Sequence, residues 1–404
     1  AERDFRLLFL GRLVSLLGSA VAPIALSFAV LDDLGGSASD LGLVLAASTV
    51  PTIVFLLVGG VWADRLPRHH VMVGSDLLEF AAQAVAAALV LTGTAQLWHL
   101  VVLAALRGTG SAFFFPAVQG IVPQVVSGER LQEANAVLRL SFSSSAILGA
   151  AAGGLLVATI GSGWALAFDA LTYLASAALL SRLRLSRDAT LAAGNFLAEL
   201  RDGWREFASR TWLWAIVLEF AFVNAFSSGV FQVLGPVVAK RSLGGAGAWG
   251  LILTGSAVGF VLGGLVTLRY RPSRPLLVAS LAILAGVPQF VLLAEVAPLA
   301  AIVLGSACAG FGYELFGVFW ETTLQQQIPG EKLSRVASYD ALGSLAIMPI
   351  GFAVAGPLAG AIGIRATLLS AAGVIVVATA LIVLVSDVRT LRQAAPRAAV
   401  TPSP

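Results

Sequence analysis

Long apolar segments are the feature that most limits what this chain can fold into. Apolar residues fall in about twelve runs of roughly 20 to 25, each long enough to cross a hydrocarbon core of about 30 Å as a helix. The runs begin near residues 6, 40, 70, 97, 134, 163, 211, 245, 273, 297, 335 and 363. Because only helices and closed barrels satisfy their backbone polar groups in lipid, such runs predict an all-α polytopic membrane protein.

The distribution of charge predicts how the chain is oriented. Only 12% of residues are charged, about half the roughly 25% usual for a soluble domain. Most Lys and Arg residues fall in alternate loops, whereas the other loops hold only Lys240, Arg241 and Arg365. By the positive-inside rule, both termini are expected to be cytoplasmic. The net charge of +3 therefore reflects topology and does not indicate nucleic-acid binding.

The sequence repeats weakly at a spacing of about 205 residues, which is typical of transporters with internal repeats. Three short motifs recur at this spacing, in pairs that begin at Gly59 and Gly263, at Pro123 and Pro329, and at Gly149 and Gly356. The repeat predicts two six-helix bundles, residues 1–184 and 211–388. A cytoplasmic linker, 185–210, joins them, and residues 389–404 form a cytoplasmic tail.

One stretch of the linker is amphipathic. Phe196, Leu200, Trp204 and Phe207 share one face of a helix, and charged residues occupy the remainder. This pattern predicts a helix that lies on the inner surface of the membrane.

The turn between the second and third spans carries a motif. Residues 60–69 read GVWADRLPRH. With twelve spans in two halves, the chain resembles the major facilitator superfamily of secondary transporters, whose pattern in this turn is G-x-L-A-D-R-x-G-R-K. The resemblance implies that Gly60, Asp64, Arg65 and Arg68 form a conformational latch, with Asp64 contacting the start of span 11 in the outward-open state. The alternative interpretation is that these charges only set topology.

Other motifs narrow the resemblance. LAALRGTGS, with Arg107, looks like the fourth-span motif of the superfamily, and GAAAGG looks like its fifth-span exporter motif. FFFPAVQGIVPQVVSGERLQEANA and FDALTYLASAALL resemble the branch that holds the enterobactin exporter and macrolide efflux pumps, which implies efflux. Small residues in these motifs let helices approach closely. The packing residues expected from this are Gly149, Gly153, Gly154, Gly356, Pro357 and Gly360.

Five ionisable residues lie deep within the predicted spans, where each costs about 2.5 to 3.5 kcal/mol by insertion scales. Applying the repeat, Glu314 corresponds to the position next to Arg107, so an ion pair or a titrating site across the pathway is expected. A carboxyl in a low-dielectric cavity can exchange protons near neutral pH. Glu314 is therefore the first candidate proton carrier and Glu219 the second. Asp76 and Asp169 are interpreted as structural charges.

Polar side chains follow Glu219 at helical spacing among phenylalanines. Such a stripe suits a large amphipathic ligand, although polar side chains that join helices together would look the same. The expected substrate-binding residues are Arg107, Asn224, Ser228, Gln232, Tyr313 and Phe316.

The sequence indicates a transporter and not an enzyme. It contains no zinc-ligand spacing, no cysteine pair and no Ser/His/Asp arrangement, so neither a metal nor a cofactor is expected. We predict proton-coupled efflux of a hydrophobic or amphipathic small molecule, such as a drug, macrolide or siderophore, by a monomer in a bacterial inner membrane. Expected partners are the substrate, protons and the lipid bilayer. The alternatives are an importer of a small nutrient and a non-pumping scramblase or receptor.

Overall fold

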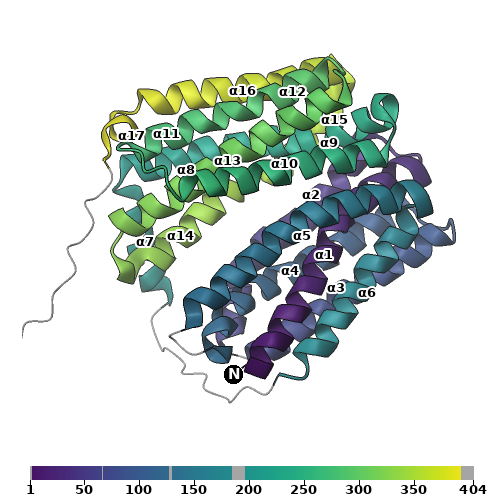
Figure 1. Cartoon of the computed structure of the whole chain (residues 1–404), viewed down its shortest axis with the longest axis horizontal. Coiled ribbons are helices and arrows are strands. Elements are labelled where there is room, and N and C mark those ends of the chain that lie inside the picture. The colour runs from purple at the N-terminus through teal and green to yellow at the C-terminus, as the bar shows by residue number, and fades with distance from the viewer. Residues whose placement is uncertain (1, 66, 127–129, 184–195, 393–404) are drawn as a thin grey trace, which may run out of the picture.

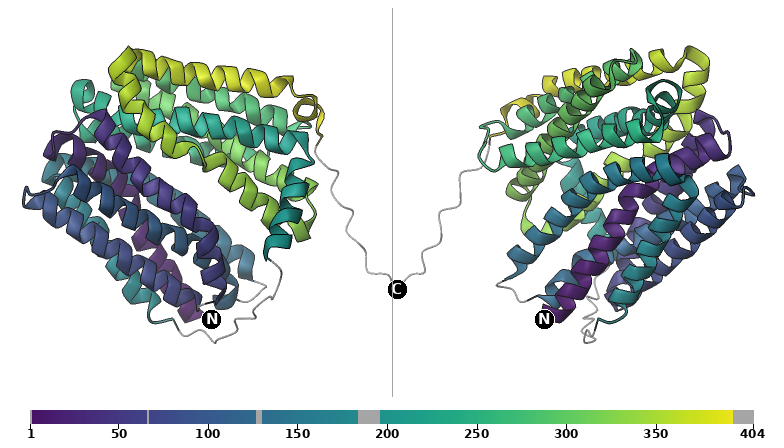
Figure 2. Two further views of the ribbon diagram at one scale, coloured as in Figure 1. Left: turned by 180° about the vertical axis from the view of Figure 1, so that it is seen from behind. Right: turned by 45° about the vertical axis from the view of Figure 1, so that its right-hand side comes forward.

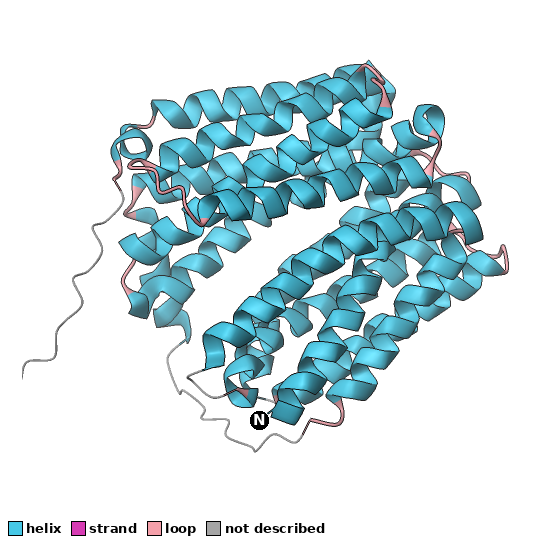
Figure 3. Cartoon of the chain, viewed as in Figure 1, coloured by secondary structure: helices cyan, strands magenta, loops and turns pink. Residues whose placement is uncertain are grey.

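The computed structural model describes residues 2–65, 67–126, 130–183 and 196–392, and within these ranges all regular secondary structure is helical (Figure 3). Twelve segments of this part are long and apolar enough to cross a membrane. They begin within a few residues of the predicted starts, which confirms the all-α polytopic fold. The predicted boundary between residues 184 and 185 lies outside the described residues.

The twelve spans form two bundles (Figure 1). The N-terminal bundle consists of α1 (Glu2–Phe28), α2 (Ala38–Arg65), α3 (Arg68–Leu91), α4 (Leu97–Val125), α5 (Leu131–Ile160) and α6 (Ser162–Leu180), with a short π-helix, η1 (Ala29–Asp33), after α1. Helix α7 (Phe196–Ala208) then leads into the second bundle.

The C-terminal bundle is less regular, because three of its spans, 7, 9 and 11, are assembled from helical pieces. Span 7 comprises α8 (Thr211–Val223), η3 (Asn224–Ser228), α9 (Gly229–Val238) and η4 (Ala239–Leu243). Span 9 comprises α11 (Pro275–Ala282), η5 (Ile283–Gly286) and α12 (Val287–Ala294). Span 11 comprises α14 (Gly330–Leu345) and α15 (Met348–Ile362). The other helices are α10 (Ala246–Thr267), α13 (Leu299–Gln327), α16 (Ile364–Leu384) and α17 (Ser386–Thr390).

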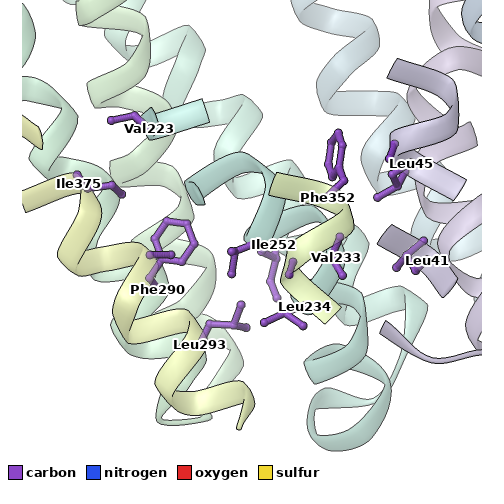
Figure 4. Close-up of a cluster of buried hydrophobic side chains, with 14 of the residues drawn as sticks. Leu41, Leu45, Val223, Val233, Leu234, Ile252, Phe290, Leu293, Phe352 and Ile375 are labelled. Atoms are coloured by element: carbon purple, nitrogen blue, oxygen red, sulfur yellow. The ribbon is translucent and has the colours of Figure 1, made fainter. Parts of the chain in front are cut away.

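The two bundles meet at one end and diverge toward the end that holds the N-terminus and α7, as Figures 1 and 2 show from opposite sides. At the closed end, α2 packs against α9 and α15, with Leu41 and Leu45 lying beside Val233 and Phe352 (Figure 4). An ion pair at the same end joins Lys240 Nζ to Asp32 Oδ1 at 2.8 Å.

Glycines allow the closest approaches between and within the bundles. A Cβ at Gly154 of α5 would lie 2.8 Å from the Cα of Gly250 of α10, and Gly356 of α15 similarly abuts Ser39 of α2. Gly149 and Gly153 of α5 face α1 within the N-terminal bundle. Among the described residues, a Cβ at Gly360 would contact nothing within 4 Å, so the packing role predicted for Gly360 is not seen. Pro357 lies inside α15.

The amphipathic helix α7 packs on α14 at the open end. The ring of Trp204 lies 5.5 Å from that of Tyr339, and Phe207 is buried, whereas Trp204 remains half exposed. Glu206 accepts hydrogen bonds from Lys332 and Arg210, at 2.8 and 2.7 Å. Part of the face that was predicted to meet the membrane surface therefore meets the C-terminal bundle instead.

The charge on Glu206 is expected to hold α7 in place. Hydrogen bonds from Lys332 and Arg210 keep the pKa of the Glu206 carboxyl below its usual value. Because docking lowers the pKa of this carboxyl, its ionisation stabilises the docked helix at pH values above about 4.3, the ordinary pKa of a glutamate. This stabilisation is lost as pH falls through the lowered pKa of the docked state. Glu206→Gln should therefore accelerate hydrogen exchange of α7 at pH 7 by about two- to fivefold, the range for a partly exposed ion pair.

The matched control is Glu295→Gln. Glu295 also pairs with an arginine, Arg365, at 2.6 Å, but this pair is exposed and joins the residue after α12 to α16. Exchange in α7 should be unchanged in that variant. Equal exchange rates in Glu206→Gln and the parent protein would mean that ring packing alone docks the helix.

Candidate functional site

A pocket of about 450 Å³ lies in the C-terminal bundle, between α8, η3, α10, α13 and α14. Four of the expected substrate-binding residues line it: Asn224, Ser228, Tyr313 and Phe316. The remaining lining residues are Ile216, Phe220, Phe260, Gly317, Trp320, Glu321, Asp340, Ala341, Ser344 and Leu345. Neither Gln232 nor Arg107 is part of this lining, so the predicted substrate residues do not all come together.

Stacked aromatic rings form one wall of the pocket. The rings of Phe220 and Phe316 lie 4.1 Å apart and are inclined by 13°. Trp320 continues the stack, with its ring 6.1 Å from that of Phe316. Phe316 and Trp320 are four residues apart on α13, which places them on the same face of the helix. The wall is therefore aromatic along the length of this stack.

The pocket also carries polar groups in fixed positions. The side-chain amide of Asn224 donates to the backbone oxygen of Ser344 at 3.1 Å, which fixes η3 against α14. Asp340 Oδ2 accepts a hydrogen bond from Trp320 Nε1 at 2.8 Å, and its Oδ1 accepts one from the Ser344 hydroxyl at 3.3 Å. The pocket thus presents an ordered carboxylate beside an aromatic surface.

The sequence analysis missed Asp340. This residue stands near the start of span 11, where an acidic residue reads as part of the polar flank of a helix. A signal was nevertheless present, since Ser344 follows Asp340 by one turn in an otherwise apolar stretch.

The two predicted proton carriers lie outside the pocket lining. Glu219 of α8 is buried, and neither carboxylate oxygen has a hydrogen-bond partner among the described residues. Glu314 of α13 is partly buried and packs against α10, where a Cβ at Gly263 would lie 2.9 Å from its own Cβ. Its neighbours on the helix, Tyr313 and Gly317, line the pocket. Both carboxyl groups are therefore within the bundle that holds the pocket.

A second cluster of polar groups is buried in the N-terminal bundle. Helix α3 contributes Asp76, Glu79 and Gln83, which share one face because they are three and four residues apart. Helix α6 contributes Asp169 and Tyr173, likewise four residues apart. All five side chains are at least nine-tenths buried.

Arg107 of α4 is the cation of this cluster. It hydrogen-bonds the Tyr173 hydroxyl and interacts electrostatically with Glu79 and Asp169. Asp169 also accepts a hydrogen bond from Gln83 Nε2 at 2.7 Å. Two polar contacts complete the cluster: Ser111 donates to Glu79 at 2.8 Å, and the hydroxyls of Ser19 and Tyr173 are 3.0 Å apart.

This arrangement differs from the expected ion pair across the pathway. Among the described side chains, the carboxyl groups that interact with Arg107 all belong to its own bundle, and Glu314 is not one of them. The repeat relates Arg107 and Glu314 by their spacing in the sequence alone. It could not show that the arginine would turn inward, toward carboxyl groups of α3 and α6.

Asp76 and Asp169 lie in this cluster, and so does Glu79, which the sequence analysis did not single out. The missed signal is the helical spacing of Asp76, Glu79 and Gln83 within one apolar segment. Most of the predicted latch lies outside the described side chains. The side chains of Gly60, Asp64 and Arg65 are among those not described, and so are those of Ser334 and Arg335 at the start of span 11, the predicted partner of Asp64. Arg68 is the first residue of α3.

Comparison with known proteins finds relatives of almost the whole chain. A family model described as Major Facilitator Superfamily matches residues 8–346. The multidrug efflux pump Tap of Mycolicibacterium fortuitum is 30% identical over 371 residues, which cover 87% of this chain and 88% of Tap. Macrolide efflux protein A of Streptococcus pyogenes is 24% identical, with 96% and 97% of the two chains covered. The enterobactin exporter EntS of Salmonella paratyphi A is also 24% identical, with 97% and 94% covered.

A solved structure supports the same fold. A mutant of the nucleoside transporter NupG superposes with a TM-score of 0.77, covering 94% of this chain and 98% of that one at 13% identity. At this identity the likeness concerns the fold alone. Together with the relatives above, it confirms the resemblance predicted from the sequence, including the branch with macrolide and enterobactin exporters.

Proposed function

The chain belongs to the Major Facilitator Superfamily, whose members are transporters and not enzymes, and on that premise we propose that it exports a hydrophobic or amphipathic small molecule in exchange for protons. The observation that carries this proposal is the aromatic-walled pocket of about 450 Å³ in the C-terminal bundle. Pockets that are mostly apolar and contain a few fixed polar groups suit such ligands. The efflux proteins among the relatives support the outward direction.

We further propose that the structure represents the inward-facing state of a monomer in a bacterial inner membrane. In the predicted orientation, the end that holds the N-terminus and α7 is cytoplasmic, and this is the end at which the bundles diverge (Figure 1). The contacts of α2 with α15 and of α5 with α10 then close the outer end. Rocking of one bundle against the other would open it, as in other transporters built from repeats. The turn with Asp64 would latch the opposite state.

Proton coupling is proposed to use Glu314 first and Glu219 second. An unpartnered carboxylate in an apolar environment is costly, and protonation removes that cost. Glu219 is in this situation among the described residues. Glu314 is one residue from Tyr313 of the pocket, so a bound substrate could alter its surroundings. Antiport requires that binding of a proton and binding of substrate oppose each other, and both would take place in the C-terminal bundle.

The test uses purified protein in proteoliposomes with an imposed pH gradient and a lumenal pH dye. Addition of a macrolide or a lipophilic cation should trigger proton movement. Glu314→Gln should reduce this movement by about tenfold or more, as expected when an intramembrane titrating group is removed. Glu219→Gln should reduce it less, and Glu295→Gln, which changes an exposed ion pair, should leave it unchanged.

Two outcomes would contradict the proposal. Proton-driven accumulation of the compound on the side that corresponds to the cytoplasm would indicate an importer. Ligand movement with no proton movement in the parent protein would indicate a facilitator that does not pump. In either case the folded state of each variant is checked by its elution and melting profile.

A further inference from the structure

A second concave surface, of about 620 Å³, lies between α10 and α13. Its lining is mostly apolar and ends in an arginine and a tyrosine. We call this surface the lateral groove, and its lining residues are Leu262, Leu265, Val266, Arg269, Tyr270 and Phe311. None of these residues lines the pocket described above, so the groove and the pocket are separate sites.

The lateral groove is on the outside of the C-terminal bundle. On α10, Leu262 is two residues from Phe260 of the pocket, so their side chains point in nearly opposite directions. On α13, Phe311 is about two and a half turns from Trp320 of the pocket, again on the opposite side. Leu304 lies about two turns before Phe311 on the same face and is 67% exposed. In a bilayer this face therefore meets lipid.

The depth of the groove in the bilayer follows from the direction of α10. This helix begins at the closed end, where Gly250 abuts Gly154 of α5, and runs about 33 Å to the end that holds α7 (Figure 1). In the predicted orientation that end is cytoplasmic. Leu262 and Arg269 are about 10 Å apart along the helix axis, and the hydrocarbon of one leaflet is about 15 Å deep. The apolar part of the groove thus fits within the cytoplasmic leaflet, with Arg269 near its surface.

The polar end of the groove is held in place by contacts to both helices. The backbone N–H groups of Arg269 and Tyr270 donate to the carbonyl oxygen of Val266, at 3.1 and 2.9 Å, so the chain continues as a helical turn beyond α10. The ring of Tyr270 packs edge-on against that of Phe319 of α13, with 6.1 Å between the ring centres. The groove therefore has a defined end, at which a guanidinium and a phenol lie next to apolar side chains.

The charge at this end favours an anionic headgroup. Three exposed arginines, Arg269, Arg271 and Arg274, lie in the turn after α10 and the loop that leads to α11. Basic residues beside a membrane-spanning helix attract anionic lipids, and tyrosine is typical of the headgroup level of a bilayer. An apolar groove that ends in these groups matches a molecule with acyl chains and a negative headgroup.

We propose that the lateral groove binds an anionic phospholipid of the cytoplasmic leaflet. One acyl chain lies along Leu262, Leu265 and Phe311, and the phosphate lies beside Arg269. The inference uses the predicted orientation of the chain, and it does not depend on the direction of transport or on proton coupling.

The experiment is lipid binding to the delipidated full chain in detergent, followed by native mass spectrometry, which counts bound lipids. Dioleoyl phosphatidylglycerol and dioleoyl phosphatidylcholine serve as probes, because they share acyl chains and differ in headgroup charge. The parent protein should bind the first molecule of phosphatidylglycerol about fivefold or more tightly than phosphatidylcholine. A fivefold preference corresponds to about 1 kcal/mol, the contribution of one basic residue near an anionic lipid.

Three variants locate the site. Arg269→Gln should lower the affinity for phosphatidylglycerol about fivefold and leave that for phosphatidylcholine unchanged. The matched control is Arg182→Gln, because Arg182 is also exposed and follows the last helix of the N-terminal bundle at the same end of the molecule. This control should bind both lipids as the parent does. Val266→Trp places a large side chain in the groove and should weaken binding of both lipids.

Two results would overturn the inference. Equal affinity of the parent for both lipids would reduce the groove to ordinary annular lipid contact. An equal loss in Arg269→Gln and Arg182→Gln would mean that the basic end of the molecule attracts anionic lipid in general. The melting profile of each variant confirms that it is folded. Because the assay contains no substrate and no ion gradient, failure of proton-coupled export would leave this inference intact, and the reverse also holds.

Discussion

Replacing Gly250 with leucine is expected to reduce transport by about 100-fold, because it prevents the closed end of the molecule from forming. A Cβ at Gly250 would lie 2.7 Å from the Cα of Gly154 and 2.8 Å from the carbonyl oxygen of Ala150. Both are backbone atoms of α5, which cannot move aside as a side chain can. Since alternating access requires both end states, a protein that cannot close this end cannot complete the cycle.

The size of the effect follows from the population of the two states. Moving an equilibrium from 1:99 to 99:1 takes about 5.5 kcal/mol. Adding methylene groups to a packed core costs about 1 to 3 kcal/mol. A whole leucine side chain between two helices that meet backbone to backbone should cost more, and so supply a large part of the free energy needed to shift the equilibrium. The variant should still fold, because the proposed outward-open state does not require this contact.

Gly247→Leu is the matched control. Gly247 lies on the same helix one turn away, and its Cβ would have only the Cβ of Ala158 nearby, at 3.9 Å. Crosslinking between Asp32→Cys and Lys240→Cys, in a background with Cys308→Ala, reports closure directly. The yield should fall sharply in Gly250→Leu and persist in Gly247→Leu. Full transport by Gly250→Leu would show that the contact between α5 and α10 is not needed.

This contact also marks a limit of sequence reasoning. The fifth-span motif singled out Gly154 as a packing residue, but nothing in the sequence identified Gly250 as its partner. The contact joins helices from different halves, so it depends on how the two bundles pack and not on local sequence. The spans themselves were predictable, because hydropathy over a window of fixed length reflects the thickness of the bilayer and does not depend on which helices are neighbours.

The pocket was predictable in part for a similar reason. Asn224 and Ser228 were found by helical spacing, and Tyr313 and Phe316 by their place on one helix near a deep acid. Asp340 was missed because its role depends on α14 packing beside α13, which brings it to Trp320. Local periodicity identifies the faces of single helices, whereas a site that uses three or more helices depends on how they pack.

Replacing Arg107 with alanine should have the largest effect on stability. Arg107 is the only basic residue among the described members of the N-terminal cluster, which contains the carboxyl groups of Asp76, Glu79 and Asp169. Removing one partner of a buried charge pair costs about 3 to 5 kcal/mol, because the remaining charge is left uncompensated. Here the carboxyl groups would be left facing one another across α3 and α6.

The expected results are a clear fall in Tm and a loss of transport that follows the loss of folded protein, because about 3 to 5 kcal/mol is a large fraction of the stability of a typical protein. Arg107→Lys keeps the charge but not the planar group with several donors, so it should be intermediate. Because the penalty arises from unpaired acids, adding Glu79→Gln to Arg107→Ala should recover part of the Tm. A double variant that is no more stable than Arg107→Ala would mean that the arginine acts through packing, and that the acids of this cluster carry no charge for it to balance.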